Sequence, residues 1–173
     1  MGRDHFEEFS FIQKAKGAKS LSYNFTCKSA SFSKELKEKF LHVLKFHESR
    51  FRISLHTSPE EELHDMIIGM REGSFVYPHK HKKSESYHII EGRIALIYFD
   101  EEGNIVHTVI MSRDDTLVAR VDKESYHAII SFSDAVYHEC RIGPFVPETD
   151  SVFAPWCEND KDAFMNDIIK KIG

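Results

Sequence analysis

The sequence has few cysteines and lacks any long apolar run. Its three cysteines, Cys27, Cys140 and Cys157, lie far apart and form no CxxC pair. This spacing excludes a dense disulfide framework and favours a reducing compartment. No stretch approaches the roughly 18 apolar residues that would span a bilayer, and the charged first 20 residues contain no secretory signal. We therefore expect a cytoplasmic protein that does not enter a membrane.

An excess of basic charge is also missing. The formal net charge is −5, from 28 acidic and 23 basic residues, which argues against a general nucleic-acid-binding protein. Hydrophobic residues make up 41% and charged residues 29% of the 173-residue chain, as in ordinary globular proteins. A chain of this length forms one compact domain with a substantial core.

Short β-forming segments separated by polar turns fill the middle of the chain. Their even spacing is typical of a β-sandwich or a small barrel. A helix is predicted over residues 33–45, because apolar side chains recur there at helical spacing, and another over residues 160–172. We expect an N-terminal arm and helix packing on the barrel (1–48), the barrel itself (49–158) and a C-terminal helix (159–173).

Two histidines and a glutamate, His79, His81 and Glu85, lie between Gly73 and Gly92 in a segment rich in β-formers. In an unbulged strand these odd-numbered side chains share one face, and two imidazoles with one carboxylate suit a divalent metal. The lysines between them allow the alternative of a solvated surface strand. Their interleaving also fits a strand with lysines outward and ligands inward, which is the interpretation we favour.

The spacing resembles the first signature of the cupin superfamily, G-x5-H-x-H-x3-E-x6-G, at every fixed position. The resemblance implies a mainly β fold, the double-stranded β-helix or jelly roll. It also implies a fourth metal ligand from a later strand, for which His127 is the candidate. Asp122 and Glu124 stand where the second cupin signature has proline and glycine. Iron, zinc, manganese and nickel all suit such a ligand set.

A second set of motifs covers roughly residues 50 to 158. It consists of Arg50-x-Arg52, His56, Gly73-Ser74-Phe75-Val76-x-Pro78-His79-x-His81, Phe99-Asp100-x-x-Gly103, Gly143-Pro144-Phe145 and Phe153-Ala154-Pro155-Trp156. In these motifs the chain resembles the WbuC family of small cupin-fold metalloproteins. This closer resemblance implies an association with bacterial surface-polysaccharide metabolism.

Further polar residues are candidates for binding or catalysis. Arg50, Arg52 and His56 alternate with apolar residues, so they share one face of a predicted strand over 50–56. There the two guanidinium groups form a fork for a carboxylate or phosphate, unless the face is plain surface. Glu139 either orients a ligand residue or pairs with an arginine. The phenol of Tyr87 is a candidate acid or base, and core packing is the simpler alternative.

The resulting hypothesis is a metal-dependent enzyme acting on a small polar substrate, either anionic or carbohydrate-derived. Isomerase-like or epimerase-like chemistry, with Glu85, Tyr87 or His56 as the base, and oxygenase chemistry both stay open. The main alternative is a non-catalytic metal-containing cupin that binds a small ligand or a partner protein; a purely structural metal is a third interpretation. A homodimer is expected, because open sheet edges need covering.

Overall fold

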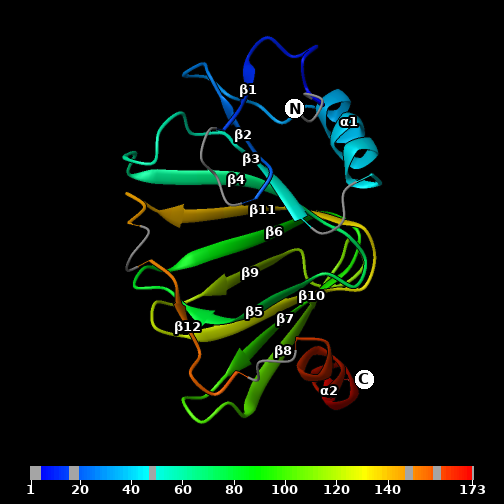
Figure 1. Cartoon of the computed structure of the whole chain (residues 1–173), viewed down its shortest axis with the longest axis vertical. Helices are drawn as coiled ribbons and strands as arrows, with labels where there is room; N and C mark the ends of the chain where they lie inside the picture. Colours follow the sequence, from blue (N-terminus) through cyan, green and yellow to red (C-terminus); the bar gives the residue numbers. More distant parts are fainter. Residues whose placement is uncertain (1–4, 16–19, 47–49, 147–149, 158–160, 173) are drawn as a thin grey trace.

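The computed structural model describes residues 5–15, 20–46, 50–146, 150–157 and 161–172 and contains two facing β-sheets (Figure 1). The first sheet has the spatial order β1 (Ile12–Lys14), β2 (Ser22–Phe25), β3 (Arg50–Ser54), β4 (Leu63–Met70), β11 (Ala135–Ile142), β6 (Glu85–Glu91) and β9 (Val118–Val121). The second has the order β12 (Val152–Phe153), β5 (Phe75–Lys80), β10 (Tyr126–Ser131), β7 (Ile94–Phe99) and β8 (Ile105–Met111).

The chain crosses between the sheets at almost every connection from β4 to β11, which produces a jelly roll. Neighbouring strands are antiparallel, apart from the parallel pair of β2 and β3. The prediction of a mainly β jelly roll with flanking helices is confirmed. The predicted N-terminal arm supplies β1 and β2 and extends the first sheet.

The apolar core between the sheets follows from strand alternation. On β7, Ile94 and Leu96 point between the sheets, whereas Ala95 and Ile97 belong to a separate cluster on the outer face. Met66, Ile68 and Met70 of β4, with other buried residues, complete the inner cluster from the opposite sheet. Both sheets therefore bury one side chain in two inside the barrel.

Helix α1 (Lys34–Leu44) covers part of the outer face of the first sheet through its predicted apolar stripe. Ser33 caps the helix by accepting the backbone N–H of Leu36 at 3.2 Å. The Phe40 ring stacks on Phe51 of β3, with ring centroids 4.2 Å apart. It also lies above Gly69 of β4, where an added Cβ would come 2.5 Å from the ring. Only glycine allows this close approach of helix and sheet.

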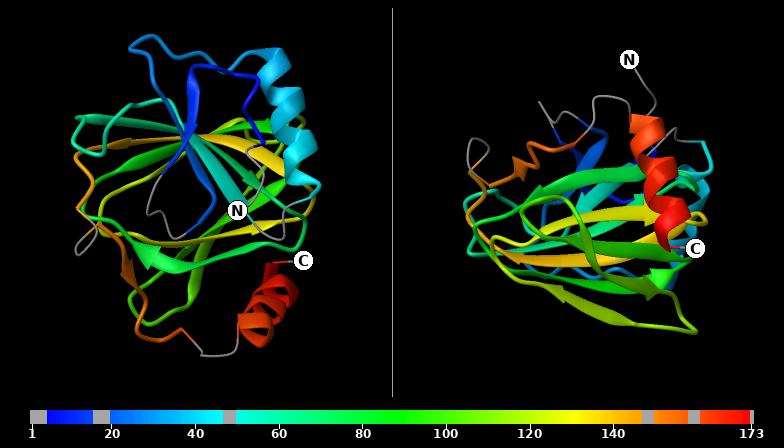
Figure 2. Two further views of the ribbon diagram at one scale, coloured as in Figure 1. Left: turned by 45° about the horizontal axis from the view of Figure 1, so that its top comes forward. Right: turned by 90° about the horizontal axis from the view of Figure 1, so that it is seen from below.

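Helix α2 (Lys161–Ile172) packs on the second sheet, so the two helices lie toward opposite ends of the molecule's long axis (Figure 2). Its Phe164 ring stacks against Tyr77 of β5 and lies beside Trp156, which contacts Phe99. The predicted first residue of this helix, at position 160, and the domain boundaries predicted at 48 and 158 lie outside the described residues. No described helix is long and apolar enough to cross a membrane.

The strand predicted over residues 50–56 is shorter in the structure. β3 ends at Ser54, and Leu55 and His56 lie in a bend that leads into a turn. The Glu61 carboxylate closes this turn by accepting the backbone N–H and the hydroxyl of Thr57, at 2.8 and 2.7 Å. His56 therefore lies beyond the end of the strand that carries Arg50 and Arg52.

Candidate metal centre

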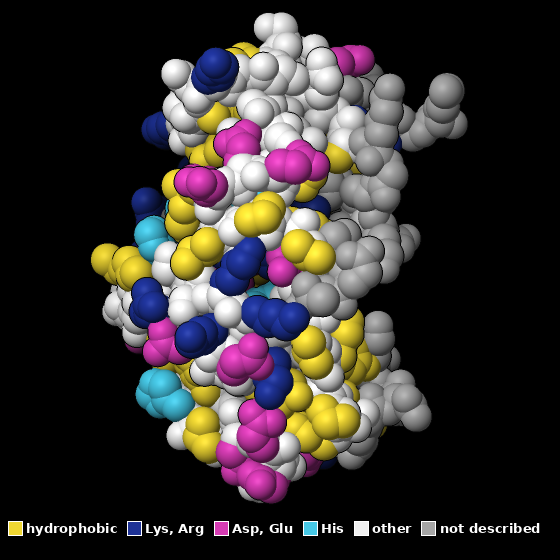
Figure 3. All heavy atoms as spheres, turned by 90° about the vertical axis from the view of Figure 1, so that its left-hand side faces the viewer, with side chains coloured by type: hydrophobic (Ala, Val, Ile, Leu, Met, Phe, Trp, Pro, Cys, Tyr) yellow, Lys and Arg dark blue, Asp and Glu magenta, His cyan; other side chains and the backbone are white. Residues whose placement is uncertain are grey.

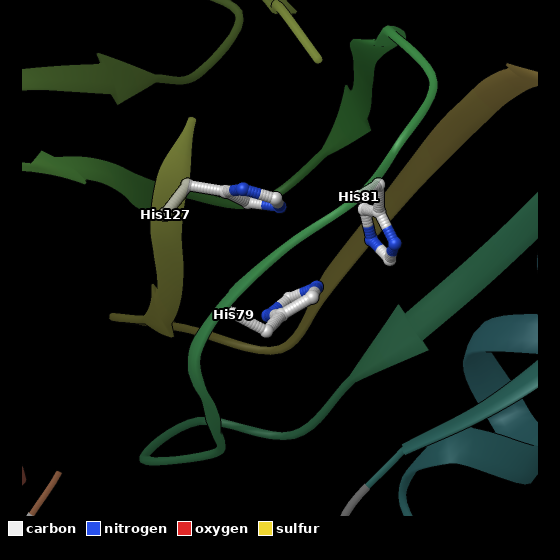
Figure 4. A group of neighbouring side chains, drawn as sticks. All are labelled: His79, His81 and His127. Carbon is white, nitrogen blue, oxygen red and sulfur yellow. The ribbon is translucent and has the colours of Figure 1, made fainter. Parts of the chain in front are cut away.

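Three histidine side chains converge inside one end of the barrel (Figure 4). His79 lies on β5, His81 directly follows that strand, and His127 lies on β10. All three are buried, and one ligand nitrogen from each lies within 4.8 Å of the others. His79 and His127 are direct partners in the register of β5 and β10, which fixes their separation.

The tautomer of each imidazole is set by a backbone carbonyl. In each ring Nδ1 lies within hydrogen-bonding distance of a carbonyl oxygen, which can only accept, so Nδ1 carries the proton. The pairs are His79 with Tyr77 (2.7 Å), His81 with Asp150, and His127 with Ser125 (3.0 Å). The Nε2 atoms are therefore left to face the centre, which is the arrangement that second-shell hydrogen bonds give to metal-binding histidines.

Glu85 supplies a carboxylate at the edge of this cluster. Its Oε1 accepts a hydrogen bond from the Tyr87 hydroxyl at 2.7 Å and lies 2.8 Å from Nε2 of His127. Its Oε2 lies 3.6 Å from Nε2 of His81 and is buried without a hydrogen-bond partner. Such an orphaned carboxylate oxygen is costly unless a cation satisfies it. The donor set therefore fits a divalent metal, with Glu85 beside two of the three histidines.

Burial and charge set the protonation of these groups. Burial, followed by the neighbouring histidines, lowers the pKa of His79 to about 3, so that its ring is neutral. Burial alone would raise the pKa of Glu85, but the hydrogen bond and charge of His127 outweigh it and lower this pKa. Burial lowers the pKa of His127, but the hydrogen bond to Glu85 and the charge of Glu85 together outweigh this effect, so the pKa is raised. A metal that binds His127 Nε2 must displace this proton.

Strand alternation does not explain the convergence of His79, His81 and Glu85. β5 ends at Lys80, and a turn then carries the chain into the other sheet, where Glu85 opens β6. The prediction of one continuous strand is therefore wrong, although the side chains do meet. They meet because the turn lies at the end of the barrel where the two sheets come together.

The turn before His127 keeps the glycine-like conformation of the cupin signature without glycine. Glu124 has φ 62°, in the left-handed region that non-glycine residues adopt only with strain. Its backbone N–H donates to the carbonyl oxygen of His81 at 2.7 Å. The strained turn before His127 is therefore hydrogen-bonded to the backbone of His81.

Charged side chains continue from the centre into the barrel. Arg141 and Glu139 of β11 lie opposite Glu85 and Tyr87 in the β6 register. Burial, followed by the charge of Glu85, raises the pKa of Glu139. Burial lowers the pKa of Arg52, whose Nε is buried without a hydrogen-bond partner. Burying charged groups in this way costs stability unless a partner group satisfies them.

Comparison with known proteins finds solved structures that share the fold of this chain. The model of one family, a domain of unknown function (DUF6016), matches residues 42–111, and no curated protein sequence matches the chain. CapF of Staphylococcus aureus, a capsular polysaccharide assembling protein, aligns over 62% of this chain and 30% of its own with a TM-score of 0.54 and 16% identity. A salicylate 1,2-dioxygenase from Pseudoaminobacter salicylatoxidans aligns over 65% of this chain and 33% of its own, with a TM-score of 0.52 and 11% identity.

The chain has a cupin-like fold of two facing β-sheets, shared with these structures. A cupin superfamily protein from Desulfitobacterium hafniense also aligns, over 58% of this chain and 86% of its own, with a TM-score of 0.46 and 14% identity. The chain spans only about a third of the CapF and dioxygenase chains. At these identities the similarity shows the fold alone.

The remaining predicted site residues do not all reach the centre. Arg50 is exposed at the start of β3, although its charge still acts on Glu139. His56 stacks on His64, with ring centroids 4.1 Å apart, and its Nδ1 lies 3.1 Å from the carbonyl oxygen of Asp65. These contacts hold His56 beside the first strands of the sheet rather than against the histidine cluster.

Two residues of the site were missed at the level of sequence. Arg141 shares the phase of Glu139 on β11, so strand alternation contained the signal for it. Asp150 acts through its main-chain carbonyl on His81, and its carboxylate lies 3.8 Å from Arg141. No side-chain pattern predicts a backbone contact between residues so far apart in the chain.

A small depression opens over the centre on the face shown in Figure 3, where lysine and arginine side chains gather. It measures about 10 Å³ and is lined by His81, Lys82, Lys83, Arg141, Ile142 and Asp150. Lys83 is held by the carbonyl oxygens of Gly143 and Pro144, each 2.7 Å from its Nζ. The entrance is thus narrow and basic.

Proposed function

We propose that this protein is a metal-dependent cupin that acts on a small polar anion. His79, His81, Glu85 and His127 would hold one divalent metal ion. The observation that carries the proposal is the combination of three imidazoles with Nδ1 tied to backbone carbonyls and a buried Glu85 oxygen without a partner. Since the Nε2 atoms and an ionised carboxylate meet at one place, a divalent cation that displaces the proton of His127 is the group that satisfies them together.

Basic residues would recognise the substrate. Lys83 and Arg141 line the entrance, and Arg52 offers an unpaired N–H further inside. A guanidinium group binds carboxylate or phosphate through fixed, directional hydrogen bonds. A divalent metal, when bound, would polarise an oxygen of the substrate or lower the pKa of a bound water. The protein's own part is to admit an anion, orient it and exclude bulk water.

Proton transfer would fall to groups beside the centre. Burial, followed by the charge of Glu85, raises the pKa of Tyr87 well above its ordinary value, so its phenol stays protonated and holds Glu85 in place. Glu85 and Tyr87 therefore remain the candidates for acid–base work at the centre. The contacts of His56 with His64 and Asp65 favour a role at the barrel rim instead.

The substrate class that we favour is carbohydrate-derived, in bacterial surface-polysaccharide metabolism. Support comes from the residues shared with the WbuC pattern and from the fold shared with CapF. The fold shared with a dioxygenase supports oxygenase chemistry to the same degree, so isomerase-like and oxygenase reactions are both retained.

A second candidate is a non-catalytic cupin whose metal centre binds a ligand or a partner protein. The narrow entrance favours it, because a depression of about 10 Å³ barely admits one water molecule. We propose a homodimer for either candidate function. β8 and β9 are sheet edges, and Val106 and Val118 on them are more than half exposed.

Cobalt substitution tests the anion site. Co(II) bound at the centre reports nearby anions through its visible spectrum, and inorganic phosphate is the probe. We expect phosphate to shift the spectrum of the native protein, and Arg52→Gln to weaken this response about tenfold. Arg93→Gln, on the outer surface beside Phe132, is the matched control. A spectrum that phosphate leaves unchanged would contradict anion recognition and leave the metal centre itself standing.

A further inference from the structure

A second concavity lies on the outer face of the first sheet, remote from the metal centre. It has a volume of about 710 Å³ and opens between the first turn of α1 and strands β4, β6 and β11. Its lining includes the side chains of Phe32, Leu55, Ile67 and Ile90, which form an apolar floor. The volume falls within the range of small-molecule sites, and apolar floors with a few polar groups are typical of them.

The rim of this cavity is basic. Lys34 and Lys37 come from the first turn of α1, and Arg113 comes from the connection between β8 and β9. Glu91 lies 3.0 Å from Lys37 and 3.6 Å from Arg113, so one carboxylate serves both cations. Within the described part of the chain, no carboxylate lies within 4.0 Å of the Lys34 ammonium group. Three cations therefore face one anion, and the rim carries an excess of positive charge.

One side of the lining is polar and fixed. His138 of β11 borders the cavity, and its Nε2 lies 2.9 Å from Oδ1 of Asp65 on the neighbouring strand. The His88 ring stands against His138, with centroids 5.1 Å apart. This side supplies hydrogen-bonding groups next to an apolar surface. A bound molecule can therefore carry polar groups as well as a hydrocarbon part.

We propose that this cavity is a second binding site, for a small amphipathic carboxylate. The hydrocarbon part would lie on the floor formed by Phe32, Leu55, Ile67 and Ile90. The carboxylate would lie at the rim, between Lys34 and Arg113. The site is independent of the metal centre, because none of its lining residues belongs to the centre and the barrel wall separates the two.

Calorimetric titration of the full-length protein tests this site with octanoate as the probe. Octanoate binds, and its neutral isostere octanamide binds about tenfold more weakly, because the amide carries no charge for the rim. The double variant Lys34→Gln, Arg113→Gln weakens octanoate binding at least tenfold. Lys123→Gln, an exposed lysine far from the cavity, leaves it unchanged, and so does His79→Ala, because the metal centre does not contribute.

Four results would overturn the proposal. The first is the absence of binding below the concentration at which octanoate forms micelles. The second is equal affinity for octanoate and octanamide. The third is loss of octanoate binding in Arg141→Gln with the rim variant unaffected, which would place the anion at the barrel entrance. The fourth is an octanoate affinity that falls as protein concentration rises, since it would show that a second copy of the chain covers the cavity. All four leave the proposed metal site standing.

Discussion

Replacing Tyr87 by phenylalanine removes a group that holds one proposed metal ligand and leaves all of the ligands in place. The substitution removes one hydroxyl, which donates to Oε1 of Glu85 at 2.7 Å and is fully buried. The ring remains, so the packing of the barrel is preserved. We therefore expect the variant to fold and to differ mainly in how firmly the Glu85 carboxylate is held.

The magnitude follows from the kind of hydrogen bond that is lost. A buried hydrogen bond to a charged acceptor contributes about 1.5–3 kcal/mol. Since about 1.4 kcal/mol corresponds to a tenfold change in affinity, metal affinity should fall about 10–100-fold. Glu85 retains its contact with His127, at 2.8 Å, which favours the lower part of this range. Competition against a chromophoric chelator measures the change directly.

Tyr137→Phe is the matched control. Tyr137 is buried in the same barrel, with its ring centroid 5.8 Å from that of Tyr87, but its hydroxyl contacts Sδ of Met70 rather than Glu85. Its removal should leave metal affinity unchanged. Equal losses of affinity in both variants would refute the assignment of Tyr87 to the centre, because they would show a general effect of barrel packing.

Three further predictions concern stability. Glu124→Gly should raise the free energy of unfolding by about 1 kcal/mol by relieving the φ of 62°, and a lower midpoint in urea would contradict the strain. Gly92→Ala should cost about 1–3 kcal/mol in thermal unfolding, because φ is 81° and the added Cβ would meet the carbonyl oxygen of Asp134; wild-type stability would refute this. Burial, and then the charge of His64, lowers the pKa of His56 to about 4, so the unfolded chain binds this proton more tightly. The contribution of neutral His56 to the free energy of unfolding should be complete above about pH 6.5. It should fall by about 1–2 kcal/mol toward pH 4, after allowance for partial exposure. In His56→Gln this part of the pH dependence of stability should vanish, and an unchanged profile would contradict the prediction.

Local patterns predicted much of this fold. The apolar stripe of α1 depends only on side-chain period, and the short β-forming segments separated by polar turns indicated the two sheets, so both followed from the sequence. The strand over 50–56 was predicted too long because Glu61 closes a turn with Thr57, and a side-chain contact of this kind overrides alternation.

The candidate site was predicted by its residues more than by its geometry. His79, His81 and Glu85 were expected on one strand, whereas they meet across a turn between two sheets. Spacing alone cannot distinguish these arrangements, since both bring the side chains together. The carbonyl oxygen of Asp150 that orients His81 was beyond prediction, because main-chain groups are the same at every position. The cavity beneath α1 likewise depends on tertiary packing.

The most direct test of the metal centre is elemental analysis of untagged protein purified without chelators, with His79→Ala and His127→Ala alongside it. His138→Ala, which removes a histidine of the outer sheet face, is the control. The account predicts close to one equivalent of a divalent metal in the native protein and in the control, and a large loss in both variants of the centre. Metal-free native protein that does not take up iron, zinc, manganese or nickel on reloading would contradict it.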